Sequence, residues 1–107
     1  MAAETPVLDT ILEINSASIG HTQLVPRELM LARFAALAAV DAPPASYLAN
    51  LGAAADSGVT AQDVQDVLVA VAPVVGTARV VSAAGNVTRA LGFAIAVAEE
   101  DAAASGA

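Results

Sequence analysis

The chain has 107 residues, of which 57% are apolar, and a net charge of −7 with four Lys and Arg residues and no Cys. Four cationic side chains are too few to neutralise a phosphate backbone. The composition therefore excludes nucleic acid as an expected partner and disfavours anionic membrane surfaces. The absence of Cys excludes disulfides, thiolate metal sites and thiol redox catalysis within the chain. A single His cannot form a zinc site by itself, and we expect neither a metal nor a cofactor.

The apolar content exceeds what one small domain can hide. A domain of this size buries about two-thirds of its unfolded surface, and the mean hydropathy is +0.68. A membrane-spanning helix needs about 20 mostly apolar residues, whereas the best uncharged run, Val67 to Ala78, is shorter and contains Pro73 and Gly76. The N-terminus also lacks the features of a signal peptide. We therefore expect residues 1–107 to form one domain of a cytoplasmic homo-oligomer, with no membrane partner.

Proline and turn-forming residues predict an all-α chain without strands. The first helix is expected to begin at Pro6 and to end near Ser16, before the turn formers of residues 16–25. Pro26 opens the second helix. Asp41 and the prolines after it stop that helix, because a proline disfavours the helical conformation of the residue before it.

The second half of the chain predicts three more helices. The third runs from about Pro44 to Asp56, with Gly58 in the left-handed position that follows a helix. Thr60 is expected to cap the fourth helix, which continues to about Ala72. The fifth is expected over Thr77–Ala98. Flexible tails are predicted at the two ends, residues 1–4 and 99–107.

Small and apolar residues on these helices indicate close packing between subunits. Alanines on the second, third and fifth helices allow backbones to approach one another. The fourth helix carries large apolar residues around most of its circumference, and such a helix must be buried on all sides. These residues are Val67, Leu68, Val69, Val71 and Val74. In a chain of this size we expect contacts between subunits to bury them.

Four segments, in their order and spacing, resemble the carboxymuconolactone decarboxylase family, which includes the alkylhydroperoxidase D-like proteins. They are Pro26–Leu29, the alanine-rich helix after it, the stretch from Ala53 to Asp63 and the Val71–Gly76 break, within a resemblance over roughly residues 24 to 92. It implies an alkylhydroperoxidase D-like bundle of about five to six helices. It also implies assembly as a trimer or hexamer, with sites between helices near the subunit contacts.

The same resemblance places the family's catalytic positions on other residue types. Counting back from Gly58, the family's His falls on Asn50 and its Cys pair on Pro43 and Ser46. Peroxidase chemistry of the peroxiredoxin type is argued against, because it requires thiols. Asn cannot shuttle a proton near pH 7 as His can. The family's upstream Glu corresponds to Glu28.

Two residues are catalytic candidates, and each has a structural alternative. Glu28 corresponds to the family's Glu, but a carboxylate there also stabilises the helix N-terminus. His21 has the only side chain with an unperturbed pKa near neutrality, but it also suits a surface loop. The substrate-binding candidates are Arg33, Tyr47, Asn50 and Arg79.

The substrate-binding candidates have alternatives as well. Arg33 shares a helix face with apolar residues, so a salt bridge is the alternative to binding an anion. Tyr47 and Asn50 lie one turn apart and either line a small polar pocket or pack structurally. The fifth helix carries a polar stripe that is either solvated or, beside a cavity, suited to a small anionic ligand. It consists of Arg79, Ser82, Asn86 and Arg89.

Three functions are consistent with these residues. The first is a decarboxylase- or lyase-like enzyme that acts on a small carboxylate or lactone without thiol chemistry. The second is a non-catalytic oligomeric binding or structural module, and the third is a partner subunit of another enzyme. The enzyme hypothesis predicts one enclosed pocket that holds Glu28, Arg33, His21 and Tyr47.

Overall fold

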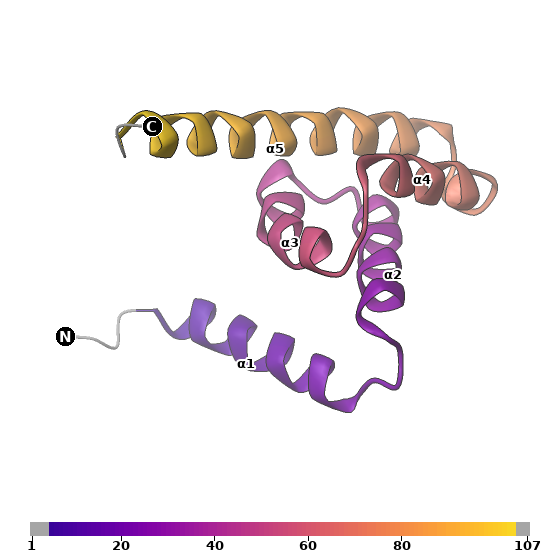
Figure 1. Ribbon diagram of the computed structural model, residues 1–107. Coiled ribbons are helices and arrows are strands. Elements are labelled where there is room, and N and C mark those ends of the chain that lie inside the picture. Colours follow the sequence, from indigo (N-terminus) through magenta and orange to yellow (C-terminus); the bar gives the residue numbers. More distant parts are fainter. Residues whose placement is uncertain (1–4, 105–107) are drawn as a thin grey trace.

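The computed structural model describes residues 5–104, which fold into five α-helices without a strand (Figure 1). The all-α prediction is confirmed. Residues 1–4 and 105–107, which belong to the predicted flexible tails, lie outside the described residues. The helices are α1 (Pro6–His21), α2 (Pro26–Ala39), α3 (Pro44–Asp56), α4 (Ala61–Val75) and α5 (Thr77–Ala104).

The predicted helix starts are correct, but three predicted ends are too early. α1 continues beyond Ser16 to His21, because serine and alanine tolerate a helix interior and no proline intervenes. α4 passes through Pro73, and the chain turns instead at Gly76, whose φ of +100° suits glycine. α5 continues beyond Ala98 to Ala104, through alanine and acidic residues that favour helix.

Helices α2 to α5 form the body of the molecule, in which α5 packs on α3 and α4 while α2 packs on α3, α4 and α5. The two largest fully buried side chains are Phe34 and Tyr47. Their rings stack with centroids 6.2 Å apart and planes inclined by 13°. The rest of the buried apolar core consists of Met30, Ala38, Ala42, Ala54, Val64, Leu68, Ala83 and Ala90.

The corner between α3 and α4 is fixed by the residues that the sequence marks as turn and cap. Gly58 has a φ of +81°, as predicted. The Asp63 amide donates to Thr60 Oγ1 over 3.1 Å, and the Thr60 amide donates to Asp63 Oδ2 over 2.9 Å. Arg27 forms an ion pair with the same carboxylate over 2.8 Å. The hydrogen bond from the Thr60 backbone is the main cause of the lowered pKa of Asp63. These contacts join α4 to the end of α3 and to the start of α2.

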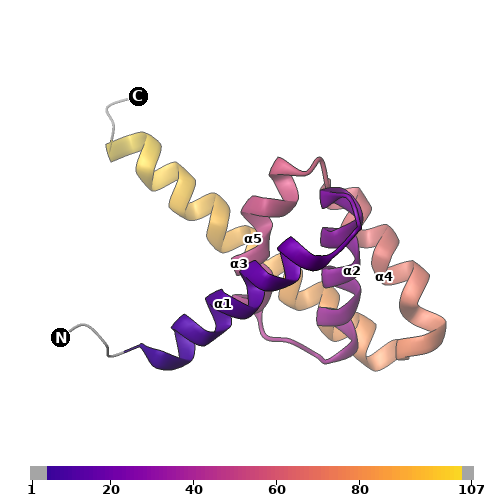
Figure 2. The same ribbon diagram turned by 90° about the horizontal axis from the view of Figure 1, so that it is seen from below.

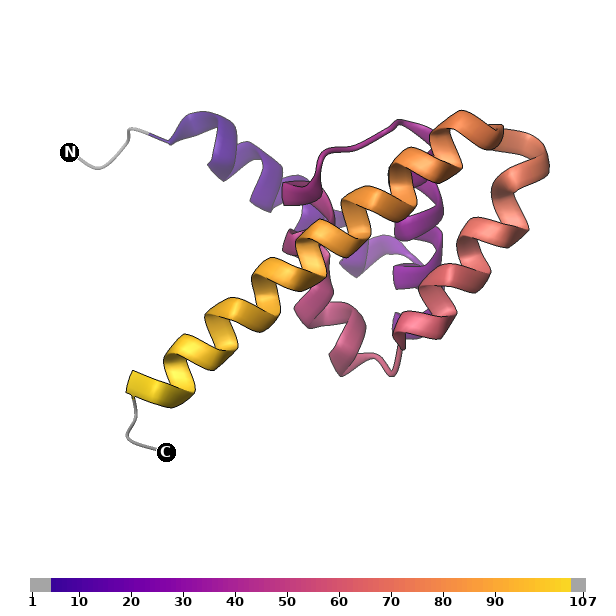
Figure 3. The ribbon, with the colours of Figure 1, turned by 90° about the horizontal axis from the view of Figure 1, so that it is seen from above.

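α1 lies apart from the body and contributes no buried residue (Figures 1 and 2). None of the other four helices packs closely against it. It is tied to the body by Arg33, whose Nη1 donates to Asn15 Oδ1 and whose Nη2 donates to Ser18 Oγ over 3.4 Å. The half of α5 that follows Ala90 also projects beyond the body (Figure 3).

Helix α4 is not buried on all sides within one chain, and its apolar circumference predicts that another subunit covers the rest. Val64 and Leu68 are buried, whereas Val69 is 74% exposed and Val74 is 88% exposed. The reason is that only the inward side of α4 meets α2 and α5. Burial of the outer side by another subunit stays a prediction.

α5 is long and apolar enough to cross a membrane by length and composition, with 28 residues and a mean hydropathy of 1.5 in its most apolar window. The uncharged run from Val67 to Ala78 overlaps only the first two residues of this helix, whose apolar window also contains charged residues. One such helix is weak evidence of a membrane span, since core helices share this composition. The first half of α5 packs in the body and buries Ala83, Asn86 and Ala90. A cytoplasmic location and the absence of a membrane partner stay predictions.

Candidate functional site

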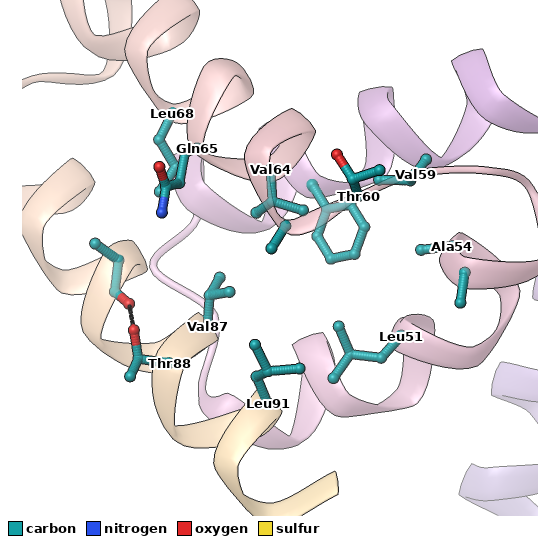
Figure 4. Close-up of a pocket in the computed structure, with 14 residues that line it drawn as sticks. Leu51, Ala54, Val59, Thr60, Val64, Gln65, Leu68, Val87, Thr88 and Leu91 are labelled. Carbon is teal, nitrogen blue, oxygen red and sulfur yellow. Dashed lines mark hydrogen bonds between the residues drawn. The ribbon is translucent and has the colours of Figure 1, made fainter. Parts of the chain in front are cut away.

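A mostly apolar groove of about 290 Å³ lies between α3, α4 and α5 (Figure 4). Its floor includes the buried ring of Phe34 from α2. Larger apolar side chains of all three helices form its walls, and Figure 4 shows them around a common opening. They are Leu51 from α3, Val64 and Leu68 from α4, and Val87 and Leu91 from α5.

Three polar side chains border the groove, and two of them are already used within the fold. Thr60 Oγ1 accepts the capping bond of α4, and Thr88 Oγ1 donates to the Ala84 carbonyl over 2.8 Å. The Gln65 amide has no hydrogen-bond partner within residues 5–104. Gln65 therefore offers the groove a free donor and a free acceptor.

The lining of the groove is apolar apart from Thr60, Gln65 and Thr88. Among the described residues that line it, none is an Asp, Glu, His, Lys, Arg or Tyr, so the walls supply no side chain of the usual general acid or base types. Residues 5–104 also contain no group of three His, Asp or Glu residues placed to hold a metal ion. A pocket of this size with one polar group suits a small, mostly apolar ligand.

The two catalytic candidates lie on the surface, away from this groove. Glu28 is exposed, and its Oε1 accepts the Val25 amide over 3.4 Å at the start of α2, which is the helix-stabilising alternative. His21 is the exposed last residue of α1. Its predicted position in a loop is wrong, because α1 extends further than expected.

Arg33 is half-buried, but its partners differ from the expected ones. Within the described residues its hydrogen-bond partners are the neutral side chains of Asn15 and Ser18, and it forms no ion pair. The predicted salt bridge is therefore wrong for a single chain. The guanidinium holds α1 to α2 through these two hydrogen bonds.

Tyr47 and Asn50 do not line the groove. Tyr47 is fully buried against Phe34, and its hydroxyl has no hydrogen-bond partner in the part of the chain that the structure describes. Burial raises the pKa of Tyr47, and the Asp41 carboxylate adds to this rise. Asn50 Nδ2 donates to the Ser46 carbonyl one turn earlier, over 2.9 Å. The ring of Tyr47 packs as the structural alternative expects, but its hydroxyl lacks the hydrogen bond that this alternative includes.

The polar stripe of α5 is exposed at Arg79 and Arg89 and buried at Asn86, and three of its residues bond to the end of α2 and the connection after it. Asn86 is 8% exposed and donates to the Ala42 carbonyl over 3.0 Å. Its own Oδ1 accepts from Arg89 Nη2 over 3.0 Å. Two further bonds run from Arg79 Nη1 to the Ala39 carbonyl and from Ser82 Oγ to Asp41 Oδ1. The stripe fastens α5 to this connection.

The structure thus places the six candidates in separate structural contexts. No hydrogen bond or ion pair joins any two of them, and none lines the groove. The groove residues are not among the candidates predicted from the sequence, although the sequence carries two signals for them. Val59 and Thr60 stand at the predicted turn, and Val87 and Leu91 are one turn apart on the fifth helix.

Tyr47→Phe tests the unpartnered hydroxyl. A raised pKa means that this tyrosine stabilises the fold fully below the ordinary tyrosine pKa of about 10, and that its contribution is lost as the pH rises through the folded-state pKa. Near pH 7 the variant is expected to be as stable as the wild type or up to about 1 kcal/mol more stable. Denaturation with urea between pH 7 and 11 measures both effects. An identical loss of stability above pH 10 in both proteins would contradict this role.

Comparison of the chain with models of protein families, with curated proteins and with solved structures finds no match.

Proposed function

We propose that this chain is a non-catalytic, homo-oligomeric binding module that takes up a small, mostly apolar molecule in the groove between α3, α4 and α5. The observation that carries the proposal is the lining of the groove, which combines apolar walls with the free amide of Gln65. Burying apolar ligand surface there supplies the affinity, and the amide orients one polar group of the ligand.

The placement of the polar residues supports binding rather than catalysis. Glu28 caps α2, and Arg33 and Arg79 hold other parts of the chain. None of these groups reaches the groove. The catalytic roles expected of the polar residues therefore have no common site to act in.

The oligomeric part of the proposal is supported by exposed apolar surface. Val69 and Val74 on the outer side of α4 are largely exposed in one chain, as are most large apolar residues of α1. Exposed patches of this kind mark contacts between proteins. An alkylhydroperoxidase D-like arrangement as a trimer or hexamer, implied by the resemblance to the carboxymuconolactone decarboxylase family, belongs to this proposal.

In a second candidate function the ligand is a small carboxylate, as the decarboxylase-like hypothesis requires. One observation favours it: the half-buried Arg33 guanidinium has neutral partners only, in the region that the structure covers. A guanidinium binds a carboxylate through two parallel hydrogen bonds. If this candidate holds, Arg33→Gln abolishes binding of a small carboxylate such as benzoate and leaves the groove ligand unaffected.

The groove is tested by titrating the protein with hexanol while the methyl resonances of valine and leucine are followed by NMR. We expect shifts concentrated on Val64, Leu68, Val87 and Leu91. Ala84→Phe places a ring in the groove and is expected to weaken binding at least about tenfold. The matched control is Ala70→Phe, because Ala70 is exposed on α4 and does not line the groove. Equal binding by the two variants, or shifts spread over other surfaces, would contradict the proposal.

A further inference from the structure

Helix α1 has an apolar face that residues 5–104 leave largely exposed. Six large apolar side chains of this helix are between 52% and 73% exposed: Val7, Leu8, Ile11, Leu12, Ile14 and Ile19. A single helix of 16 residues is marginally stable in water and gains most of its stability from packing. The Arg33 bonds hold only its C-terminal half, at Asn15 and Ser18. The first half of α1 needs a partner.

The distal half of α5 is a second uncovered apolar surface. On the side of α5 that continues the groove wall, Leu91 and Ile95 lie one turn apart and are 39% and 50% exposed. Leu91 also lines the groove, so this surface continues the apolar wall of the body. Figure 2 shows that α1 and the distal half of α5 project from the same side of the body and diverge. They are not packed against each other within one chain.

The combined area of the two surfaces matches that of a stable interface. Six large side chains of α1 and two of α5, each about half exposed, represent roughly 650 Å² that a partner would cover, within the roughly 600–1,000 Å² that each protein buries in a standard interface. Each chain carries both surfaces. Under two-fold symmetry one contact therefore occurs twice, with α1 on the partner's α5 each time.

The charges near these surfaces favour protein over a lipid surface. α1 carries Asp9 and Glu13, and the end of α5 carries Glu99, Glu100 and Asp101. Neither α1 nor α5 beyond Arg89 carries a Lys or Arg. Helices that lie on membranes are rich in these cations on their polar face, since the cations bind anionic lipids. A second copy of the chain offers apolar contact without that requirement.

We propose that α1 of one copy packs its apolar face against the distal half of α5 in a second copy, and the reverse, so that the two copies exchange their α1 arms. The inference rests on the homo-oligomer proposed above and names the segments that meet. In a hexamer, three such pairs would be present.

Chemical cross-linking tests which segments meet. Because the chain has no native Cys, only the introduced thiols react. Full-length Leu12→Cys and Ile95→Cys chains are mixed, equilibrated and treated with a short flexible bismaleimide. We expect covalent dimers in the mixture and little product from either variant alone. Glu13→Cys mixed with Ile95→Cys is the matched control, because Glu13 lies on the polar side of α1; it is expected to give at least about fivefold less product. Equal yields from the two mixtures would overturn the arm exchange.

Charge substitutions test whether the same face holds the pair together. Leu8→Glu with Leu12→Glu is expected to weaken self-association at least about hundredfold in sedimentation equilibrium. The thermal transition of the body should persist, because α1 contributes no buried residue. Glu13→Gln is the matched control and should associate as the wild type does.

The outcomes separate this inference from the proposal on which it rests. A monomeric wild type overturns both the oligomer and the arm exchange. An oligomer that survives both Leu→Glu changes overturns the arm exchange alone and leaves the outer side of α4 as the contact. Co-sedimentation of a monomeric wild type with phosphatidylcholine vesicles, lost on the same changes, would make a lipid surface the occupant and overturn the inference.

Discussion

Phe34→Ala is expected to lower the free energy of unfolding by about 3–5 kcal/mol, the usual cost of removing a buried aromatic ring. Phe34 is 1% exposed, stacks on Tyr47 and forms the floor of the groove. Its removal leaves a void beneath three helices that cannot all move inward. Small domains have a free energy of unfolding of about 5–15 kcal/mol, so the expected loss is a large share of the total. Urea denaturation followed by circular dichroism measures the loss.

Phe34→Met is the matched control, because it keeps most of the apolar volume at the same position. We expect it to cost under about 1.5 kcal/mol. If Phe34→Ala is as stable as Phe34→Met, the ring does not hold the core as the structure describes. The result would also weaken the case for the groove, which is built on the same ring.

Asn86→Ala is expected to cost about 2 kcal/mol, because it leaves the Ala42 carbonyl without its donor in a buried position. The change also removes the acceptor of Arg89 Nη2. Both losses act where α5 is fastened to the connection between α2 and α3. Thermal and urea denaturation of the variant measure the effect.

Ser82→Ala is the control for this prediction. Ser82 lies one turn earlier on the same stripe, but its bond to Asp41 is exposed, so we expect a cost of about 0.5–1 kcal/mol. Equal losses for the two variants would show that burial of Asn86 contributes nothing. The stripe would then be a solvated face after all.

The helix starts follow from residues that act locally, and these were predictable. Pro6, Pro26 and Pro44 each stand at the first helical position, and Thr60 caps α4 through its own side chain. Such signals need no information from the rest of the fold. Gly58 likewise occupies the left-handed position because of its own lack of a side chain.

The helix ends were less predictable. They depend on whether a proline, glycine or serine at a given position is enough to end the helix. Pro73 lies within the last turn of α4, where a missing amide removes only one bond. The serines and Gly20 near the end of α1 resemble a turn in composition, yet no residue among them forces the chain out of a helix. The absence of a strong breaker, and the place of Pro73 in the last turn, decided these boundaries.

The candidate site was the least predictable part. Spacing along the chain placed Arg79 and Asn86 on one face of a helix, but only the fold shows that the α2–α3 connection lies against that face. The groove likewise requires three helices to be placed at once, and its residues are ordinary valines and leucines. The sequence alone therefore predicted polar site residues that instead form hydrogen bonds within the fold.

The molecular mass of the full-length protein in solution tests the central proposal, a homo-oligomeric module, most directly. Light scattering at several concentrations is expected to give a stable multiple of the 10.5 kDa chain mass. Raising the salt concentration should strengthen the association, because it screens the repulsion between chains of net charge −7. A mass of 10.5 kDa at every concentration and salt level would contradict the proposal.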